Sequence, residues 1–263
     1  MQDLLRRIRA KFYKWTERKI RIEIDQSVKT ERLGSPYGGW IIPENWLNEQ
    51  SVCYLVGAGE DISFDLALTD KYRVRTWIID PTPRALEHFQ QWLECYRTGQ
   101  PMPCNTCQGG HYPLYKSGMA ENIVFCPVGV WNEDTTLQFF APRNDNYVSH
   151  SLVNLQRSEK HIEVPVKKLN TLMRELGHRH IDLLKIDIEG AEYQVIDSII
   201  LENIPIDILC IEYDETAANH LDPGYMDRIE NSLQKLVNAG YRIIAKEAQC
   251  HNYTLVHRRR FRS

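Results

Sequence analysis

The sequence predicts an α/β domain with a mainly parallel sheet and helices on both faces. Apolar runs typical of buried strands alternate with helical patterns along most of the 263 residues. Two of these runs end in loops of chemical interest, residues 57–59 (Gly-Ala-Gly) and residues 187–190 (Asp-Ile-Glu-Gly). Because the carboxyl ends of parallel strands meet at one edge of a sheet, both loops should border one ligand site.

The expected elements follow one another in a regular order. Apolar and alternating runs predict strands at 51–56, 73–80, 123–127, 135–140, 161–166, 181–188, 206–212, 241–246 and 252–257. Helical spacing of apolar residues predicts helices at 62–68, 84–96, 168–176, 191–201 and 222–238. Residues 98–122 are rich in Gly, Pro and Cys without such a period, so we interpret them as an insertion over the ligand edge.

The first loop has the composition of a nucleoside cradle. Glycine has no Cβ, so backbone N–H groups at residues 57–59 can approach a ligand closely. Ile62 stands where a dinucleotide fingerprint would have its third glycine. Glu60 and Asp61 lie beside the start of the next helix, where they would repel a diphosphate. The loop therefore favours a cationic ligand such as a sulfonium.

Asp80 ends the next apolar run, about twenty positions after the glycines. A carboxylate at this place can accept both hydroxyl protons of a ribose diol. Pro81 and Pro83 stop the strand and suit the start of a helix. We therefore interpret Asp80 as a ribose ligand, and the alternative that the glycines form only a tight turn is less favoured.

The second loop ends a strand with charges on one face. Alternate residues of a strand share a face, so Lys185, Asp187 and Glu189 lie together among apolar neighbours. Burying such charges unpaired costs several kcal/mol, so they must be paired or functional. Their place just before Gly190 favours a functional role. The alternative is an ion pair from Lys185 to one carboxylate that only fixes the sheet.

These motifs resemble the FkbM-type family of S-adenosylmethionine-dependent methyltransferases. The similarity lies in residues 56–65 (VGAGEDISFD), in 80–83 (DPTP) and, most specifically, in 182–192 (DLLKIDIEGAE), and it extends from about residue 37 to about residue 255. One departure is Asp61, which stands where methyltransferases often have a further glycine. The resemblance implies a Rossmann-like class I methyltransferase fold whose seven-stranded sheet closes with an antiparallel hairpin.

The resemblance also implies a cofactor and a reaction. The cofactor would be S-adenosyl-L-methionine, and the reaction O-methylation of a hydroxyl of a sugar, glycan or related natural product. The segment after the 123–127 strand would lie beside the adenine. The expected cofactor-binding residues are Val56, Gly57, Ala58, Gly59, Glu60, Ser63, Phe64, Asp80, Pro81, Thr82, Val128, Gly129, Val130 and Asp187.

Methyl transfer to a hydroxyl needs alignment and a base, because an aliphatic hydroxyl is a poor nucleophile until its proton is removed. Asp187 and Glu189 are the candidate bases, and we do not rank them. Glu212, at the tip of the neighbouring strand, could orient the hydroxyl, while Lys185 could pair with Asp187. These carboxylates, with Asp214, could instead hold a divalent cation, which we do not favour.

Composition narrows the class of protein. The formal net charge of −3 gives no bias toward nucleic acid as a partner. Cys53, Cys126 and Cys210 fall in predicted strands, where a free thiol acts as a small apolar residue, so we expect a reducing cytoplasm. No run approaches the roughly twenty apolar residues of a membrane span, and the N-terminus lacks an apolar signal region, which predicts a soluble protein.

We divide the chain into a basic N-terminal extension (1–36), a methyltransferase domain (37–257) and a basic tail (258–263) that we expect to be solvated. Residues 1–20 form a basic amphipathic helical pattern. Such a helix could lie peripherally on an anionic inner membrane surface, contact a second subunit in a homo-oligomer, or pack on its own domain. The rival function is therefore a non-catalytic adaptor that binds through this helix.

Loops carry the remaining candidates. Cys104, Cys107 and His111 have a spacing that could fit zinc, although a lone Cys pair is a weak signal and an ordinary loop with exposed thiols is the favoured alternative. Residues 144–154 form a polar stretch expected to act as a lid on the acceptor side. Aromatic residues that could stack on a sugar ring are Trp40, Trp46, Trp131 and Tyr147. Nothing in the sequence identifies the acceptor.

Overall fold

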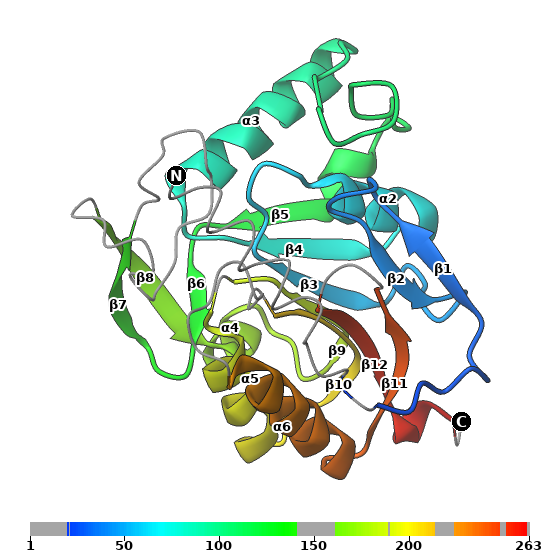
Figure 1. Cartoon of the computed structure of the whole chain (residues 1–263). Helices are drawn as coiled ribbons and strands as arrows, with labels where there is room; N and C mark the ends of the chain where they lie inside the picture. Colours follow the sequence, from blue (N-terminus) through cyan, green and yellow to red (C-terminus); the bar gives the residue numbers. More distant parts are fainter. Residues whose placement is uncertain are drawn as a thin grey trace, which may run out of the picture.

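The centre of the computed structural model is a seven-stranded sheet with the order β11-β12-β10-β9-β3-β4-β5 (Figure 1). The structure describes residues 20, 22–140, 161–188, 190–213, 224–247 and 251–261. The strands of the sheet are β3 (Val52–Val56), β4 (Arg75–Ile79), β5 (Ile123–Cys126), β9 (Ile181–Ile186), β10 (Ile206–Glu212), β11 (Tyr241–Lys246) and β12 (Asn252–His257).

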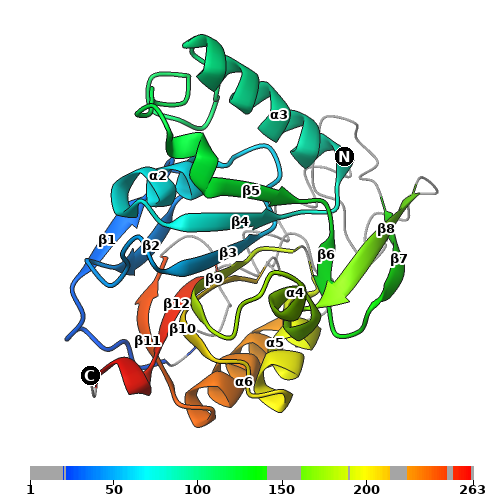
Figure 2. The same ribbon diagram turned by 180° about the vertical axis from the view of Figure 1, so that it is seen from behind.

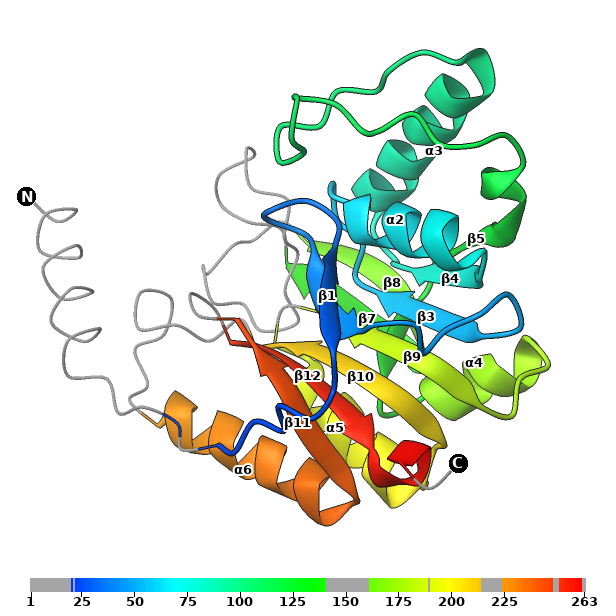
Figure 3. The same ribbon diagram turned by 90° about the vertical axis from the view of Figure 1, so that its right-hand side faces the viewer.

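Strand direction confirms the expected sheet. The neighbours β5, β4, β3, β9 and β10 all pair in parallel. Strand β12 pairs antiparallel with both β10 and β11, which makes the closing hairpin seen from the side in Figure 3. The chain runs outward from β3 through β4 to β5 and then returns to β9 on the other side of β3. The strand order therefore reverses between β3 and β9, which is where open α/β sheets bind ligands.

Helices cover both faces of this sheet, as predicted. The helices are α2 (Ser63–Tyr72), α3 (Pro83–Thr98), α4 (Leu169–Glu175), α5 (Glu192–Leu201) and α6 (Tyr225–Asn238), with 3-10 turns η1 (Met119–Asn122) and η2 (Arg258–Phe261). Helices α4, α5 and α6 lie on one face, and α2 and α3 on the other (Figure 2). None of the helices described is long and apolar enough to cross a membrane.

Alternation along the strands builds the core on both sides. In β3, Tyr54 and Val56 pack in the cluster that contains the apolar residues of α4, α5 and α6. The intervening Cys53 and Leu55 pack instead against Phe64 of α2. All four strand residues are at most 1% exposed. A strand buried on both faces explains the nearly continuous apolar run in the sequence.

A second, smaller sheet has the order β6-β8-β7. It comprises β6 (Gly129–Trp131), β7 (Thr135–Phe140) and β8 (His161–Lys168). The sequence predicted strands at β7 and β8 but neither a strand at β6 nor the association of the three, because β6 and β8 pair across a long separation. The predicted lid at 144–154 lies outside the described residues.

The N-terminal boundary at residue 37 divides a hairpin and needs correction. Strand β1 (Thr30–Leu33) pairs antiparallel with β2 (Trp40–Pro43), and the buried Trp40 and Ile42 belong to the core on the α2 side. Val28 and Ser35 are also buried. Residues 28–36 therefore pack with the domain, whereas the amphipathic pattern in residues 1–19 lies outside the described residues.

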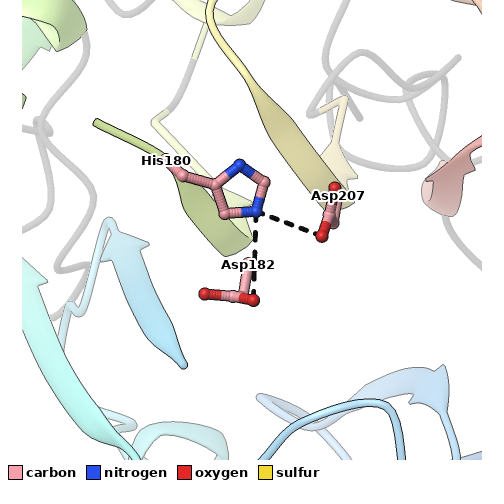
Figure 4. Close-up of side chains that lie close together, drawn as sticks. All are labelled: His180, Asp182 and Asp207. Carbon is pink, nitrogen blue, oxygen red and sulfur yellow. Dashed lines mark hydrogen bonds and ion pairs between the residues drawn. The ribbon is translucent and has the colours of Figure 1, made fainter. Parts of the chain in front are cut away.

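The predicted solvated tail also needs correction. Residues 258–261 form the 3-10 turn η2, in which Arg259 Nε lies 2.6 Å from Asp207 Oδ1. His180 Nε2 lies 3.1 Å from the second Asp207 oxygen and 3.9 Å from Asp182 Oδ1 (Figure 4). Burial raises the pKa of Asp207, but hydrogen bonds from His180 and Arg259 outweigh it and lower the pKa. The carboxylate thus holds η2 at the amino ends of β9 and β10, opposite the ligand edge.

Candidate active site

A cavity of about 520 Å³ opens at the carboxyl ends of β3, β4 and β9. Its volume is that of a small-molecule site. The predicted cofactor residues that line it are Val56, Gly57, Ala58, Gly59, Glu60, Asp80, Pro81, Thr82, Gly129, Val130 and Asp187. The predicted catalytic residues that line it are Lys185, Asp187 and Glu212. Residues far apart in the sequence therefore meet at the edge where they were expected.

Three predicted cofactor residues have other positions. Phe64 is fully buried against β2 and β3, and Val128 is buried in the core of the opposite face. Ser63 is also buried, and its Oγ accepts a hydrogen bond from the Ser35 N–H at 2.7 Å. Ser63, Phe64 and Val128 are outside the cavity lining. The structure therefore places them in packed positions, and their predicted cofactor contact stays a prediction.

Gly57 brings the two motif loops into direct contact. Its backbone has φ +84°, and a Cβ there would lie 1.7 Å from the Asp187 carbonyl oxygen. The Asp187 N–H in turn donates to the Val56 carbonyl at 3.1 Å. Only a residue without a side chain can be accommodated at this approach. The close contact makes the glycine loop and the end of β9 a single continuous wall of the cavity.

Asp80 holds the glycine loop from the β4 side. Its Oδ2 accepts hydrogen bonds from the N–H groups of Ala58 at 2.8 Å and Gly59 at 3.2 Å. Its Oδ1 accepts from the N–H and the hydroxyl of Thr82, at 2.8 and 2.6 Å. The sequence predicted a carboxylate at this edge but not that it fixes the loop. A ribose contact by Asp80 stays a prediction.

Lys185 is a buried cation beneath the same loop. Its Nζ donates to the Gly57 carbonyl oxygen and lies 3.2 Å from Asp187 Oδ2. Burial alone lowers the pKa of Lys185, but the carboxylates of Asp187, Asp65 and Glu212 raise it above the usual range. The lysine therefore remains charged, and the ion pair that we considered as a structural alternative is present within the cavity wall.

Asp187 and Glu212 present carboxylates to the cavity. The Asp187 side chain is 31% exposed, although it pairs with Lys185. Glu212, at the end of β10, accepts a hydrogen bond from Asn252 Nδ2 at 3.3 Å. The other candidate base, Glu189, and the possible metal ligand Asp214 lie outside the described residues. Of the two candidate bases, Asp187 is therefore the one whose position the structure describes.

Glu60 faces the cavity but is already paired. Arg84, in the first turn of α3, approaches Glu60 Oε1 to 2.9 Å through its NH2 group. Both side chains are partly exposed, so this pair contributes little to stability. It nevertheless reduces the negative charge that Glu60 offers to a ligand.

The insertion lies over the cavity, where the sequence placed it. Pro103, Cys104, Asn105 and Thr106 line the cavity wall. Cys104 and Cys107 are joined in a disulfide, and His111 Nδ1 lies 2.9 Å from the Tyr112 carbonyl oxygen. The two thiols are therefore bonded to each other and not exposed and free, and they do not form a zinc-ligand set with His111.

Sequence reasoning missed a polar cluster in this wall. Tyr112 OH accepts a hydrogen bond from the Ile62 N–H at 3.1 Å and lies 2.8 Å from His88 Nε2. His88 lines the cavity, and burial lowers its pKa, so it is neutral at pH 7. The signal in the sequence that could have pointed to His88 was its position in the second turn of the helix that begins at Pro83.

The strand order, the antiparallel β12 and a ligand cavity at the switch point together define a Rossmann-like class I methyltransferase fold. The family model described as the methyltransferase FkbM domain matches residues 52–243. The chain therefore belongs to the FkbM methyltransferase family. The matched span contains the glycine loop, Asp80 and the Lys185–Asp187 pair.

Individual relatives resemble only parts of this chain. The probable methyltransferase-like protein 24 of Rattus norvegicus and that of Homo sapiens are each 45% identical over 38 residues, which is 14% of this chain and 10% of the relative. A solved methyltransferase FkbM from Methylobacillus flagellatus KT is 14% identical, with a TM-score of 0.48 over 80% of this chain and 44% of its own. M. jannaschii TYW2, solved in complex with AdoMet, is 10% identical, with a TM-score of 0.32 over 89% of this chain and 86% of its own.

Proposed function

We propose that this protein transfers a methyl group from S-adenosyl-L-methionine to a hydroxyl of a sugar, glycan or related natural product. The observation that carries the proposal is the cavity in which the glycine loop, Asp80 and Asp187 meet. Family membership supports methyl transfer, and the charge and shape of the cavity support the choice of donor and of an oxygen acceptor.

The chemistry of the cavity fits a cationic nucleoside. The residues that line it include the carboxylates of Asp61, Asp80, Asp187 and Glu212. The lining also contains the buried ammonium of Lys185 and His88, which is neutral. An excess of carboxylates in a partly closed site attracts a positively charged ligand. Residues 57–59 would hold the amino-acid part of the donor, Asp80 the ribose, and Gly129 and Val130 the base. When bound, this cofactor supplies a methyl group attached to a positively charged sulfur.

Asp187 is placed to act on the acceptor. We propose that its carboxylate accepts the proton of the acceptor hydroxyl as that oxygen attacks, which general-base catalysis requires for an aliphatic hydroxyl. Glu212, from the neighbouring strand, would orient the same hydroxyl. Lys185 holds Asp187 in place through the contact at 3.2 Å. A divalent cation at Asp187 is less favoured because it would lie beside the Lys185 charge.

Aromatic residues near the cavity mouth support a ring-shaped acceptor. Trp40 lines the cavity but is only 2% exposed, whereas Tyr37 lines it and is 80% exposed. Trp46 packs instead against Phe261 with a ring-centroid distance of 5.6 Å. Among the described aromatic residues that line the cavity, Tyr37 therefore exposes the most surface to a sugar ring, although the sequence reasoning did not single it out.

The test begins with binding and then measures transfer. Calorimetry should detect binding of S-adenosylmethionine and of its demethylated product, and failure to bind either would overturn the proposal. The Asp187→Asn variant should retain cofactor binding and lose about 100-fold in turnover. The matched control is Asp197→Asn, which alters an exposed carboxylate on α5.

The acceptor class needs its own assay. Metabolite and glycan fractions are incubated with methyl-labelled cofactor, with and without chelator. We expect label in carbohydrate or natural-product hydroxyls, with no effect of the chelator. Label that enters only protein or nucleic acid would contradict the acceptor class, and loss of transfer with chelator would restore the metal alternative.

A further inference from the structure

The Asp61 carboxylate joins three separate segments, of which two line the cavity. Its Oδ1 accepts the Ser63 N–H at 2.9 Å, at the start of α2. Its Oδ2 accepts the Ser35 hydroxyl at 2.7 Å and the Thr106 hydroxyl at 2.6 Å. Ser35 belongs to the loop between β1 and β2, and Thr106 to the insertion. One side chain therefore connects segments that the sequence separates by 26 and 45 positions.

The first of the two segments that line the cavity is the hairpin turn, residues 35–38. Ser35 Oγ, which donates to Asp61, also accepts the N–H groups of Gly38 at 2.8 Å and Tyr37 at 3.2 Å. A Cβ on Gly38 would lie 2.6 Å from Asp61 Cγ, so the turn is in close contact with the carboxylate. Tyr37 and Gly38 both line the cavity. Asp61 is thus one of the groups that hold the turn, together with Ser63 Oγ, which accepts the Ser35 N–H at 2.7 Å.

The second of the two is the disulfide loop, residues 103–107. The Cys104–Cys107 disulfide encloses Thr106, and the Cys107 N–H donates to the Cys104 carbonyl at 3.2 Å. The Cys104 N–H donates in turn to the Gly110 carbonyl at 3.0 Å. These bonds fix the loop internally, whereas the Thr106 hydroxyl ties it to the cofactor side of the cavity.

Asp61 carries its charge while it makes these contacts. Burial raises its pKa, but the hydrogen bonds from Ser63, Thr106 and Ser35 outweigh burial and lower the pKa below the usual range. Hydrogen bonds to an ionised acceptor are stronger than those between neutral groups. The charge-assisted hydrogen bonds of this carboxylate are therefore strong enough to hold two irregular segments, the hairpin turn and the disulfide loop, in fixed positions.

We propose that Asp61 is a positioning residue that fixes the disulfide loop and the hairpin turn around the cofactor site before the cofactor binds. The identity of the ligand in this inference rests on the proposed function. The ordering of the disulfide loop and the hairpin turn by Asp61 does not. A wall ordered in advance loses less conformational entropy on binding, which raises affinity. Because one carboxylate oxygen receives both hydroxyls, loosening the disulfide loop also loosens the turn.

The first test compares two substitutions at one position. Thr106→Val removes the hydroxyl and keeps the shape, and Thr106→Ser keeps the hydroxyl. Loss of a hydrogen bond to a charged group should weaken S-adenosylmethionine binding by about tenfold in Thr106→Val. Thr106→Ser should bind like the wild type. The matched control is Thr98→Val, which removes a hydroxyl that bonds the Glu94 carbonyl at 2.9 Å, outside the cavity lining.

The second test needs no cofactor. Backbone hydrogen exchange is measured on the unliganded wild type and on both Thr106 variants. Thr106→Val should speed exchange in residues 103–107 and also in residues 35–38, while Thr106→Ser and Thr98→Val leave both segments unchanged. Faster exchange in the disulfide loop alone would overturn the coupling. Unchanged exchange in both segments would overturn the inference entirely.

A double substitution then tests Asp61 itself. Asp61→Asn should weaken cofactor binding at least as much as Thr106→Val, and the two changes together should cost less than the product of their separate effects. Full multiplicativity would mean that Thr106 does not act through Asp61. If the wild type binds no cofactor, the proposed function fails, and the exchange measurement still decides this inference.

Discussion

The Lys185 ammonium donates to the Gly57 carbonyl oxygen, although the two residues are 128 positions apart in the sequence. The same ammonium pairs with Asp187 at 3.2 Å. One buried side chain therefore connects the glycine loop to the candidate base. We make predictions for the glycine loop, for Lys185, for the buried Asp65 and for the Cys104–Cys107 disulfide.

Replacing Gly57 by alanine should prevent stable folding or cost more than about 3 kcal/mol, because the backbone of Asp187 occupies the space that a Cβ needs. Gly59→Ala is the matched control. Gly59 has φ +52°, and no atom lies within 4 Å of the place where its Cβ would stand, so only about 1 kcal/mol of backbone strain is expected. Urea unfolding measures both, and equal losses would contradict the close-contact explanation.

Lys185→Met should destabilise the fold by about 3 kcal/mol, because it leaves the buried Asp65 and the partly exposed Asp187 without their cation. The matched control is Lys235→Met, which removes an exposed pair with Asp197 and should change stability by less than about 1 kcal/mol. Chemical unfolding at neutral pH gives the comparison. A Lys185 variant as stable as the control would show that the buried pair adds nothing to the free energy of unfolding.

Asp65 should make stability fall as pH rises. Among the described residues no other side chain donates a hydrogen bond to its buried carboxylate oxygens. Burial outweighs the charge of Lys185 and the backbone N–H of Asp65 itself, and it raises the pKa of Asp65 from the usual 3.8 to about 6. The folded state therefore holds the Asp65 proton more tightly than the unfolded state. Its contribution is favourable below about pH 4 and lost by about pH 6, an order of 3 kcal/mol.

The Asp65→Asn variant isolates this effect. Its free energy of unfolding relative to the wild type should increase from pH 4 to pH 7, as measured by urea titration at several pH values. Glu192, whose pKa burial raises to about 7, contributes equally to both proteins and cancels in the difference. A difference that is constant with pH would show that Asp65 is not the titrating group.

Reducing the Cys104–Cys107 disulfide should weaken cofactor binding by a few-fold, because the loop that lines the cavity loses its internal constraint. Dithiothreitol supplies two electrons, becomes a cyclic disulfide and leaves two protein thiols. The double variant Cys104→Ser and Cys107→Ser should bind like the reduced wild type and show no response to dithiothreitol. Calorimetry in both buffers checks this, and an equal response in the variant would assign the effect to other cysteines.

Local patterns were sufficient to predict most of the fold. The alternation of strands and helices, the two glycine turns and the final pair of strands all depend on neighbouring residues. The predicted strands at 241–246 and 252–257 match β11 and β12. By contrast, β1 (Thr30–Leu33) lacks the apolar run that marks the other strands, and the β6-β8 pairing depends on which distant segments meet. Hydrophobic period does not specify such partners.

The candidate site could likewise be predicted only in part from the sequence. The sequence placed carboxylates and glycines at the strand ends, because strand ends can be read from the chain. It did not reveal that Asp80 binds the loop backbone, that Asp61 receives three hydrogen bonds, or that Cys104 pairs with Cys107. The burial of Ser63 and Phe64 was not predicted for a related reason: only the packing of α2 decides which of its residues face the core.

The reversal of strand order between β3 and β9 has a kinetic consequence. The loop at Gly57 makes its native contacts only when Lys185, which lies 128 positions later in the sequence, and Asp187 pack against it. Such pairing closes a long segment at an entropic cost before any contact offsets it. The pocket therefore has no early local precursor, and its assembly should coincide with the slowest cooperative step on the folding pathway.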